Sequence, residues 1–251
     1  MGTDPSALSR SMMVSRFSSV VRPEPPQGHQ VIVWQAALDH EPSVIGDLES
    51  FLSDDEIKRA NKLRLERDRS RFVAARGKLR QIIGSYLEIK PEKVRFDYGP
   101  NGKPRLDKQY GELRFNISHS GEMALFAFAD RQEIGVDVEY CDRSVDVAKL
   151  ARYVFDESDI ADFCSLSAKD QISAFYRSWT RKEALAKAMG INISALLNKD
   201  TIRERPFGKI SERIYDYDMV ISHLDIGNEY VAAIASESKL VITWSQPQII
   251  C

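Results

Sequence analysis

The stretch Ile-Gly-Val-Asp-Val-Glu at residues 134–139 decides how the rest of the chain is interpreted. Its apolar residues alternate with other residues, which is the pattern of a half-buried β-strand. Successive strand side chains point to opposite faces, so Asp137 and Glu139 leave the same face. Val136 and Val138 occupy the other face. A lone Asp-x-Glu pair is most often the solvent side of an edge strand, so its meaning depends on what packs against it.

A second stretch, Trp-Thr-Arg-Lys-Glu-Ala-Leu-Ala-Lys at residues 179–187, is predicted to form a helix that meets this strand. Glu183 and Lys187 are four residues apart, so they share one helix face. Three carboxylates and one lysine on two facing elements suggest a hard divalent ion beside a phosphate. Mg²⁺ takes oxygen ligands and often binds one or two carboxylates together with substrate phosphates. Without the strand, Lys182 and Glu183 would be an ordinary exposed pair.

The composition excludes several classes of protein. The 251 residues are 43% hydrophobic, which allows a sizeable core in one large domain or two small ones. The net charge of −2 gives no basic field for nucleic acid or a membrane surface, and we expect neither as a partner. No apolar run reaches the length of a transmembrane helix. The three cysteines fit neither a metal site nor a disulfide framework, which indicates a reducing compartment, and we expect a cytoplasmic protein.

The chain divides into three parts by pattern. Residues 1–29 are rich in Ser, Pro and Met and have no periodic pattern, so we expect a flexible N-terminal extension. A weak resemblance to a transit peptide is the alternative for this segment. Residues 30–131 are predicted to form an N-terminal lobe, and residues 132–251 a C-terminal lobe that carries both motif stretches.

The order of predicted elements repeats between these two lobes. Each lobe has a strand, a short helix with an acidic first turn, a long helix and a late apolar strand. Gly190 and Gly227 each follow a glycine of the first lobe, Gly84 and Gly121, by 106 residues. The repeat predicts an α+β fold of two similar α/β lobes related by a pseudo-twofold axis. Ligand pockets often lie between such lobes, so we expect the active site there.

Three further residues have a structural and a functional interpretation. Lys103 lies in an Asn-Gly-Lys-Pro segment, which is good turn chemistry. His119 lies between apolar strands, where a histidine usually belongs to the core, but with nearby basic residues it could bind a phosphate. Arg76 is one of many basic residues on the helix predicted at 67–87, most of which must be solvated. The sequence has no nucleophile elbow, P-loop or dinucleotide-binding glycine motif.

Taken together, these motifs resemble the 4′-phosphopantetheinyl transferases. The segment at 135–139, followed about forty residues later by the segment at 179–187, is similar to the paired signature of that family. Three further segments resemble blocks of its monomeric, two-lobed class, which is typified by the surfactin-synthetase activator: residues 71–76, 102–104 and 116–120. The resemblance covers about residues 31–236.

The resemblance implies a set of roles for individual residues. Three carboxylates would hold Mg²⁺ on the pyrophosphate of coenzyme A: Asp137, Glu139 and Glu183. Lys187 would contact the same phosphates. The coenzyme A site would be lined by Arg76, Lys103, Ser118 and His119, with Arg76 and His119 near the 3′-phosphate. Arg59, and more loosely Lys62, would assist from the preceding helix. Family members differ at the position of Ala75, and an alanine there removes one possible side-chain contact.

The implied reaction moves 4′-phosphopantetheine from coenzyme A to a serine of an apo acyl or peptidyl carrier protein and releases adenosine 3′,5′-bisphosphate. Phosphoryl transfer depends mainly on positioning and charge neutralisation. A serine hydroxyl is a weak nucleophile until a base takes its proton. Glu183 is the candidate base, because it belongs to the carboxylate cluster and lies on a different element. We also expect a groove with apolar and basic residues between the lobes for the carrier.

Two other functions are compatible with the same motifs. The first is a non-catalytic module that binds coenzyme A or a carrier protein, although such a binder has less need of all four residues Asp137, Glu139, Glu183 and Lys187. The second is a different Mg²⁺-dependent enzyme that acts on a nucleotide pyrophosphate, such as a hydrolase. Carriers of fatty-acid, polyketide and peptide synthesis all remain open as partners.

Overall fold

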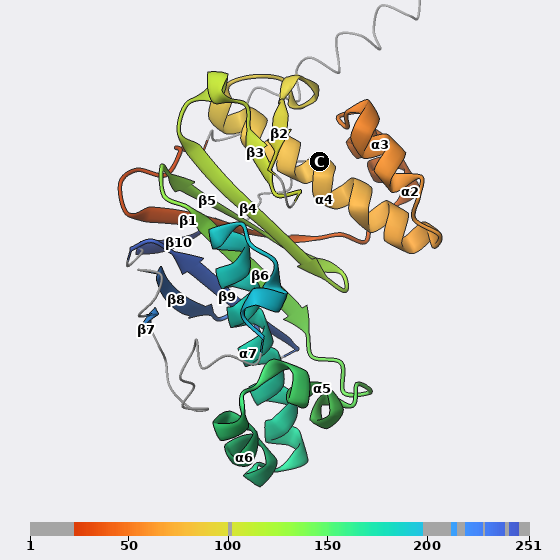
Figure 1. Ribbon diagram of the computed structural model, residues 1–251. Helices are drawn as coiled ribbons and strands as arrows, with labels where there is room; N and C mark the ends of the chain where they lie inside the picture. The colour runs from red at the N-terminus through yellow and green to blue at the C-terminus, as the bar shows by residue number, and fades with distance from the viewer. Residues whose placement is uncertain are drawn as a thin grey trace, which may run out of the picture.

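The computed structural model describes residues 23–99, 102–197, 212–214, 219–227, 229–238 and 241–245. Residues 1–22, most of the predicted N-terminal extension, lie outside the described residues. The described chain forms two lobes, each with a four-stranded sheet and one long helix (Figure 1). The predicted α+β fold of two lobes is therefore confirmed.

The first sheet has the strand order β10-β1-β5-β4. Its strands are β1 (Gln30–Ala37), β4 (Leu113–Ser120), β5 (Met123–Asp130) and β10 (Val241–Ser245). Helix α4 (Glu66–Leu87) covers one face, and two short helices pack against α4: α2 (Pro42–Glu49) and α3 (Asp54–Ala60). A small hairpin of β2 (Phe96–Tyr98) and β3 (Pro104–Leu106) follows α4, with single 3-10 turns at Pro91–Lys93 and Lys108–Tyr110.

The second sheet has the order β6-β9-β8-β7. Its strands are β6 (Ile134–Tyr140), β7 (Glu212–Ile214), β8 (Met219–Leu224) and β9 (Tyr230–Ser236). The long helix α7 (Ala168–Met189) packs on β6 and β9. Helices α5 (Val147–Val154) and α6 (Glu157–Ser165) pack on α7 and form a small separate core around Phe163 and Phe175. A 3-10 turn at Ile193–Ala195 follows α7.

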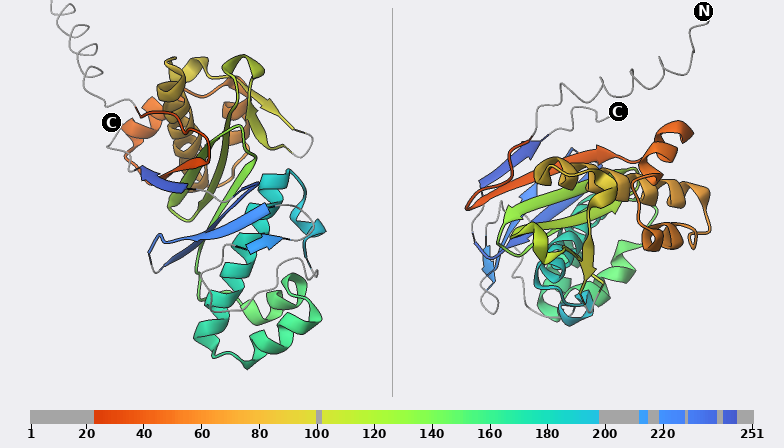
Figure 2. Two further views of the ribbon diagram at one scale, coloured as in Figure 1. Left: turned by 90° about the vertical axis from the view of Figure 1, so that its left-hand side faces the viewer. Right: turned by 90° about the horizontal axis from the view of Figure 1, so that it is seen from above.

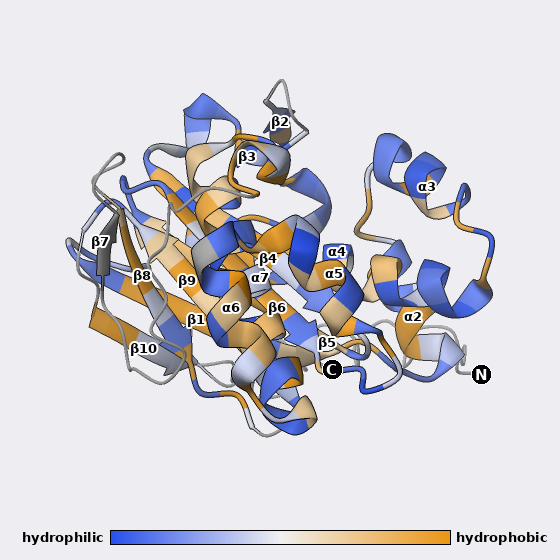
Figure 3. Cartoon of the chain, turned by 60° about the horizontal axis from the view of Figure 1, so that its bottom comes forward, coloured by the Kyte–Doolittle hydropathy of each residue, from blue (hydrophilic) through white to orange (hydrophobic). Residues whose placement is uncertain are grey.

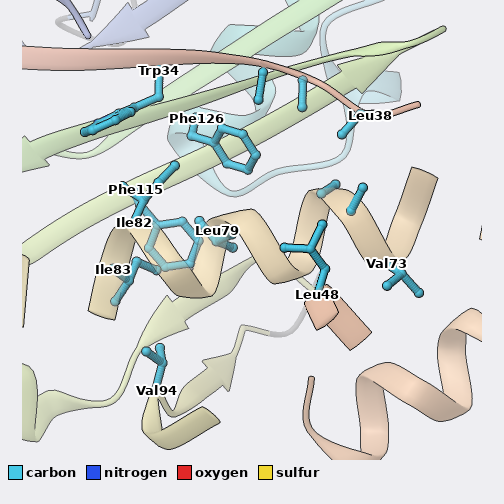
Figure 4. Packing of buried hydrophobic residues seen from close by; sticks show 14 of the residues in the cluster. Trp34, Leu38, Leu48, Val73, Leu79, Ile82, Ile83, Val94, Phe115 and Phe126 are labelled. Atoms are coloured by element: carbon cyan, nitrogen blue, oxygen red, sulfur yellow. The ribbon is translucent and has the colours of Figure 1, made fainter. Parts of the chain in front are cut away.

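Strands β1 and β5 are apolar on both faces because both faces are covered. One face packs against α4 and is lined by Ile32, Trp34, Phe126 and Phe128. Figure 4 shows Leu79 and Ile82 of α4 on the side of this cluster that faces the sheet. The other face packs against the second sheet and is lined by Val31, Val33, Leu125 and Ala127. Strands buried on both faces are expected to be nearly continuous in hydrophobicity, as β5 is. Figure 3 shows the hydrophobic residues along the inner strands and mostly hydrophilic residues on α3.

The last strand does not stay in the second lobe. We predicted residues 132–251 as the C-terminal lobe, but β10 pairs in parallel with β1 at the edge of the first sheet, with Gln30 opposite Val241 (Figure 2). Strand β10 thus lies across the lobe boundary from the rest of the predicted C-terminal lobe. None of the described helices combines the length and hydrophobicity that a membrane span requires.

The glycines that suggested an internal repeat differ in structural role. Gly190 caps α7 with a φ of 68°, whereas Gly84 lies inside α4, where an added Cβ would be 2.7 Å from the Ile89 carbonyl. Gly121 and Gly227 do correspond, because both adopt positive φ in the turn before an apolar strand. The pseudo-twofold relation between the lobes stays a prediction.

Candidate active site

Strand β6 and helix α7 bring the predicted carboxylates together at the boundary of the lobes. Asp137 on β6 is 3% exposed. Its Oδ1 accepts hydrogen bonds from Lys187 Nζ at 2.6 Å and from Ser118 Oγ at 2.8 Å. Its Oδ2 is buried and has no hydrogen-bond partner among the described residues. Asp137 therefore has one carboxylate oxygen that accepts hydrogen bonds and one that has no partner among the described residues.

The close approach of β6 and α7 depends on Gly135. A Cβ at this position would be 2.0 Å from the Ala184 carbonyl oxygen and 2.4 Å from the Ala188 nitrogen. Real side chains do not come this close, so only glycine lets the helix backbone lie against the strand. The approach puts Glu183 and Lys187 beside Asp137 and Glu139.

Glu139 is held by two neutral donors. Ser120 Oγ donates to its Oε2 at 2.7 Å, and the Trp179 ring nitrogen donates to its Oε1 at 3.2 Å. Ser120 belongs to β4 and Trp179 to α7, so the carboxylate is oriented from both lobes. Neither donor carries charge, so no ion pair within the described residues neutralises the Glu139 carboxylate.

The three carboxylates repel one another. Burial raises the pKa of Asp137, although Lys187 and Ser118 oppose the rise. Burial and then the charge of Asp137 raise the pKa of Glu139, against the hydrogen bond from Ser120. Burial also raises the pKa of Glu183, with Lys187 opposing and the other two carboxylates adding to the rise. Glu183 makes no side-chain hydrogen bond that joins it to the described part of the protein.

The residues fit a hard cation, although the structure does not pre-form a closed site. Within the described ranges, no group of three His, Cys, Asp or Glu side chains is already arranged around one metal position. The unpartnered Oδ2 of Asp137, the unbonded carboxylate of Glu183 and the mutual repulsion of the three acids all favour a divalent cation among them. An all-oxygen donor set suits Mg²⁺ rather than a softer metal.

Strand β4 supplies two more predicted site residues. The Ser118 hydroxyl donates to Asp137 and accepts hydrogen bonds from Lys187 Nζ at 3.0 Å and the Val138 N–H at 3.3 Å. One donor and two acceptor positions are all that a hydroxyl has, so they are fully used within the protein. His119 is exposed, and desolvation by its surroundings and then the Lys187 ammonium lower its pKa.

Arg76 lies in a buried ionic cluster in the first lobe. Its guanidinium forms an ion pair with Glu56, which also accepts from Arg80 Nε at 2.6 Å. Both arginines lie over the Phe96 ring, with Arg76 at 4.8 Å from the centroid. Arg76 Nη2 also reaches the Tyr98 hydroxyl at 3.5 Å. Sequence reasoning missed Glu56, which a capping box, Ser53 followed by Glu56, could have indicated.

Lys103 contacts the second lobe. Its ammonium lies 3.0 Å from Glu133, 3.2 Å from the Ile134 carbonyl and 3.4 Å from the Ala188 carbonyl. Burial lowers its pKa, against the charge of Glu133. A pocket of about 510 Å³ opens beside it, between the β2–β3 hairpin, the start of β4 and the end of α7.

Arg59 is the one predicted site residue on α3. It is exposed, and its guanidinium lies 6.0 Å from the centroid of the Phe72 ring. No described contact joins it to the carboxylates, to Lys187 or to Arg76. The structure thus gathers Asp137, Glu139, Glu183, Lys187, Ser118 and His119, while Arg76 and Lys103 belong to separate clusters.

In comparisons with known proteins, both lobes match models of the same kind of enzyme. Residues 133–235 match the model of the 4′-phosphopantetheinyl transferase superfamily, and residues 41–131 match the N-terminal 4′-phosphopantetheinyl transferase model. The chain is 39% identical to 4′-phosphopantetheinyl transferase HetI of Nostoc sp. over 180 residues, which is 69% of this chain and 76% of the relative. It is 30% identical to transferase psf-1 of Bacillus pumilus over 174 residues, 69% and 73% of the two chains. It is 28% identical to transferase Sfp of Bacillus subtilis over 167 residues, 66% and 73% of the two chains.

Proposed function

Because the chain belongs to the 4′-phosphopantetheinyl transferase family, we propose that it moves 4′-phosphopantetheine from coenzyme A to a serine of an apo carrier protein, with Mg²⁺ as cofactor. The observation that carries the finer proposal is the cluster at β6 and α7. Asp137 presents a free buried oxygen, Glu139 and Glu183 lie beside it, and Lys187 provides the one ammonium in direct contact with Asp137 among the described residues. Such a cluster favours a ligand that brings both a cation and phosphates.

Three carboxylates would hold Mg²⁺: Asp137 through Oδ2, Glu139 and Glu183. When bound there, Mg²⁺ would neutralise charge that develops on the pyrophosphate oxygens. Lys187 pairs with Asp137 at 2.6 Å and its side chain is 28% exposed, so its ammonium can turn towards the pyrophosphate once a cation balances the carboxylates. The Asp137–Lys187 ion pair thus keeps both groups in place before substrate arrives.

The transfer forms one phosphorus–oxygen bond, breaks another and moves one proton. The serine oxygen of the carrier bonds to the phosphorus that carries pantetheine, and the bond from this phosphorus to the bridging oxygen of the pyrophosphate breaks. The leaving group is adenosine 3′,5′-bisphosphate, which keeps the bridging oxygen. The serine proton goes to a base of the protein, directly or through water. In-line displacement of this kind needs the two substrates held in place more than it needs covalent help.

Glu183 is the proposed base. It lies on α7 rather than on β6, and its carboxylate accepts no side-chain hydrogen bond from the described residues, whereas Asp137 and Glu139 each do. Glu183→Gln should lower turnover far more than it lowers coenzyme A affinity. Equal losses of turnover and of coenzyme A binding, the latter measured by calorimetry, would contradict the base role and leave Glu183 as a metal ligand alone.

The remaining predicted residues are proposed contacts of coenzyme A. His119 is exposed next to Lys187, where it can meet a phosphate. Arg76 and Arg80 share one carboxylate, so their cluster with Glu56 keeps one positive charge that can attract the 3′-phosphate. Lys103 and Arg59 are proposed contacts on the strength of the family resemblance. Ser118 is proposed to line the coenzyme A site without hydrogen-bonding the ligand through its hydroxyl, which is committed to Asp137, Lys187 and the Val138 N–H. We also propose that the enzyme is a cytoplasmic monomer. Size-exclusion chromatography with light scattering would check its monomeric state.

The test is an assay with defined substrates. The protein is incubated with Mg²⁺, coenzyme A and a purified apo acyl carrier protein, and the carrier is weighed by mass spectrometry. The proposal expects a gain of one phosphopantetheine that disappears with chelator or in Asp137→Ala. No gain on this carrier or on a peptidyl carrier, with coenzyme A still bound, would favour a binding module. Cleavage of coenzyme A without any carrier would favour a hydrolase.

A further inference from the structure

The two lobes meet along two strand edges, β4 and β6. Each is the last strand of its sheet, so each has one row of backbone groups that no strand of its own sheet pairs. In an antiparallel pair such as β6 with β9, alternate residues turn their N–H and C=O groups away from the partner. Buried groups of this kind must find other partners, because an unpaired buried N–H is costly.

Alternate side chains of β4 supply those partners, one for every second N–H of β6. We call each such hydrogen bond a rung, and the three together the ladder. Asn116 Oδ1 accepts from the Val136 N–H at 2.9 Å, and Ser118 Oγ accepts from the Val138 N–H at 3.3 Å. Ser120 Oγ accepts from the Tyr140 N–H at 3.1 Å. Every rung joins residues 20 positions apart, so the two edges run in the same direction in a fixed register.

Lysines satisfy the carbonyl groups of the same edge. Lys103 Nζ donates to the Ile134 carbonyl at 3.2 Å, and Lys187 Nζ lies 3.4 Å from the Val136 carbonyl. Five side chains thus take the place of a strand along the free edge of β6. Where the edges of β4 and β6 meet, polar side chains therefore replace backbone pairs, beside the apolar contact between the two sheets.

The two serine rungs have a second contact that the asparagine rung lacks. Ser118 also donates to Asp137, and Ser120 also donates to Glu139. In both cases the carboxylate belongs to the residue just before the one whose N–H donates to the serine. At the Asn116 rung the corresponding residue is Gly135, which has no side chain. The same hydroxyl therefore fixes both the strand register and the direction of one carboxylate.

We propose that Ser120 is a positioning residue of the transferase that orients Glu139 for the metal ion, and that Ser118 does the same for Asp137. The inference rests on the proposed function, because it needs Glu139 and Asp137 to be metal ligands. Groups that orient a metal ligand typically change metal affinity by about 10- to 100-fold when they are removed. These hydrogen bonds from β4 explain how two different sheets keep the carboxylates in register.

The experiment measures metal binding directly. Wild type, Ser120→Ala, Ser120→Thr and Ser85→Ala are titrated with Mn²⁺ in the presence of coenzyme A and without carrier, by electron paramagnetic resonance. Ser120→Ala should raise the Mn²⁺ dissociation constant about tenfold or more, and Ser120→Thr, which keeps the hydroxyl, should stay within about threefold of wild type. Ser85→Ala is the matched control, because among the described residues the Ser85 hydroxyl bonds only to the Ile82 carbonyl of its own helix.

A second measurement tests the hydrogen bond from the Tyr140 N–H to Ser120 Oγ. Amide hydrogen exchange at Tyr140 should accelerate in Ser120→Ala and not in Ser120→Thr. With excess Mg²⁺, Ser120→Ala should regain most of its turnover, which a merely unfolded variant would not do. An unchanged dissociation constant in Ser120→Ala, or an equal loss in Ser120→Thr, overturns the positioning role.

The outcomes separate this inference from the proposed function. Wild type that binds Mn²⁺ and modifies a carrier, with Ser120→Ala indistinguishable from it, would leave the transferase intact and refute only the role of Ser120. Wild type that binds no Mn²⁺ with coenzyme A would refute the metal site and the inference together.

Discussion

Removing the charge of Glu56 should strongly destabilise the first lobe. Glu56 is fully buried and pairs with Arg76 and with Arg80, whose side chain is only 2% exposed. Glu56→Gln keeps the shape and the hydrogen-bond acceptor for the Ser53 N–H, but it leaves two buried guanidiniums with no carboxylate. Breaking one partner of a buried ion pair typically costs about 3–5 kcal/mol. In a chain of this size, that loss corresponds to a fall of roughly 6–20 °C in Tm.

The assay is thermal and urea denaturation followed by circular dichroism, with an exposed ion pair as control. Arg71 donates two hydrogen bonds of 2.6 Å to Asp39, whose side chain is 50% exposed. Exposed pairs contribute about 0–1 kcal/mol, so Asp39→Asn should cost much less than Glu56→Gln. Equal losses in the two variants would refute the reasoning that burial makes the Glu56 cluster dependent on charge.

The pH dependence gives an independent check of the same cluster. Burial alone would raise the pKa of Glu56, but Arg76, the Ser53 N–H and Arg80 outweigh it and lower the pKa. A carboxyl whose pKa is lower in the folded state stabilises the protein above its unfolded pKa of about 4.3, and this contribution is lost as pH falls through the folded pKa. The stability difference between wild type and Glu56→Gln should therefore be full near neutral pH and shrink below about pH 4. A difference that is constant down to the acid transition would contradict the ionised state of Glu56.

Three more substitutions test the site and the seam. Gly135→Ala should destabilise the protein by about 1–3 kcal/mol in urea denaturation and abolish transfer, because the added Cβ meets the Ala184 carbonyl; a stable, active variant would refute the close approach. Trp179→Phe should weaken Mn²⁺ binding about tenfold by removing the donor to Glu139, and unchanged binding would mean that this contact does not orient the carboxylate. Lys103→Met should cost about 1–3 kcal/mol by leaving buried carbonyls of the second lobe without a donor, and a loss confined to coenzyme A affinity would instead favour a direct ligand contact.

Part of the site followed from local geometry. The alternation of residues 134–139 put Asp137 and Glu139 on one face, and the four-residue spacing put Glu183 and Lys187 on another. The structure agrees with both, since Lys187 contacts Asp137 and all three carboxyls influence one another. The periods of strands and helices are properties of the backbone, so they hold before any packing is known.

Other predictions could not come from spacing alone. Arg76 stays a proposed contact of the 3′-phosphate, but spacing did not reveal that its guanidinium also pairs with Glu56, 20 residues earlier in the chain. Lys103 likewise stays a proposed contact of coenzyme A, but spacing did not reveal that its ammonium donates to carbonyls of the second lobe. A basic side chain in a motif does not reveal which buried acid or carbonyl will take its charge.

The sequence by itself determined the two lobes, the strand and helix that carry the acids, and the face on which each acid lies. Only the tertiary structure decided that β10 pairs in the first sheet and that Gly135 lets the backbone of α7 lie against β6. It also decided that Asn116, Ser118 and Ser120 replace a strand along β6. Local periodicity depends on neighbours within a turn or a strand pair. Register between two edges depends instead on which side chains of the folded lobes can satisfy buried backbone groups, and those partners lie far apart in the chain.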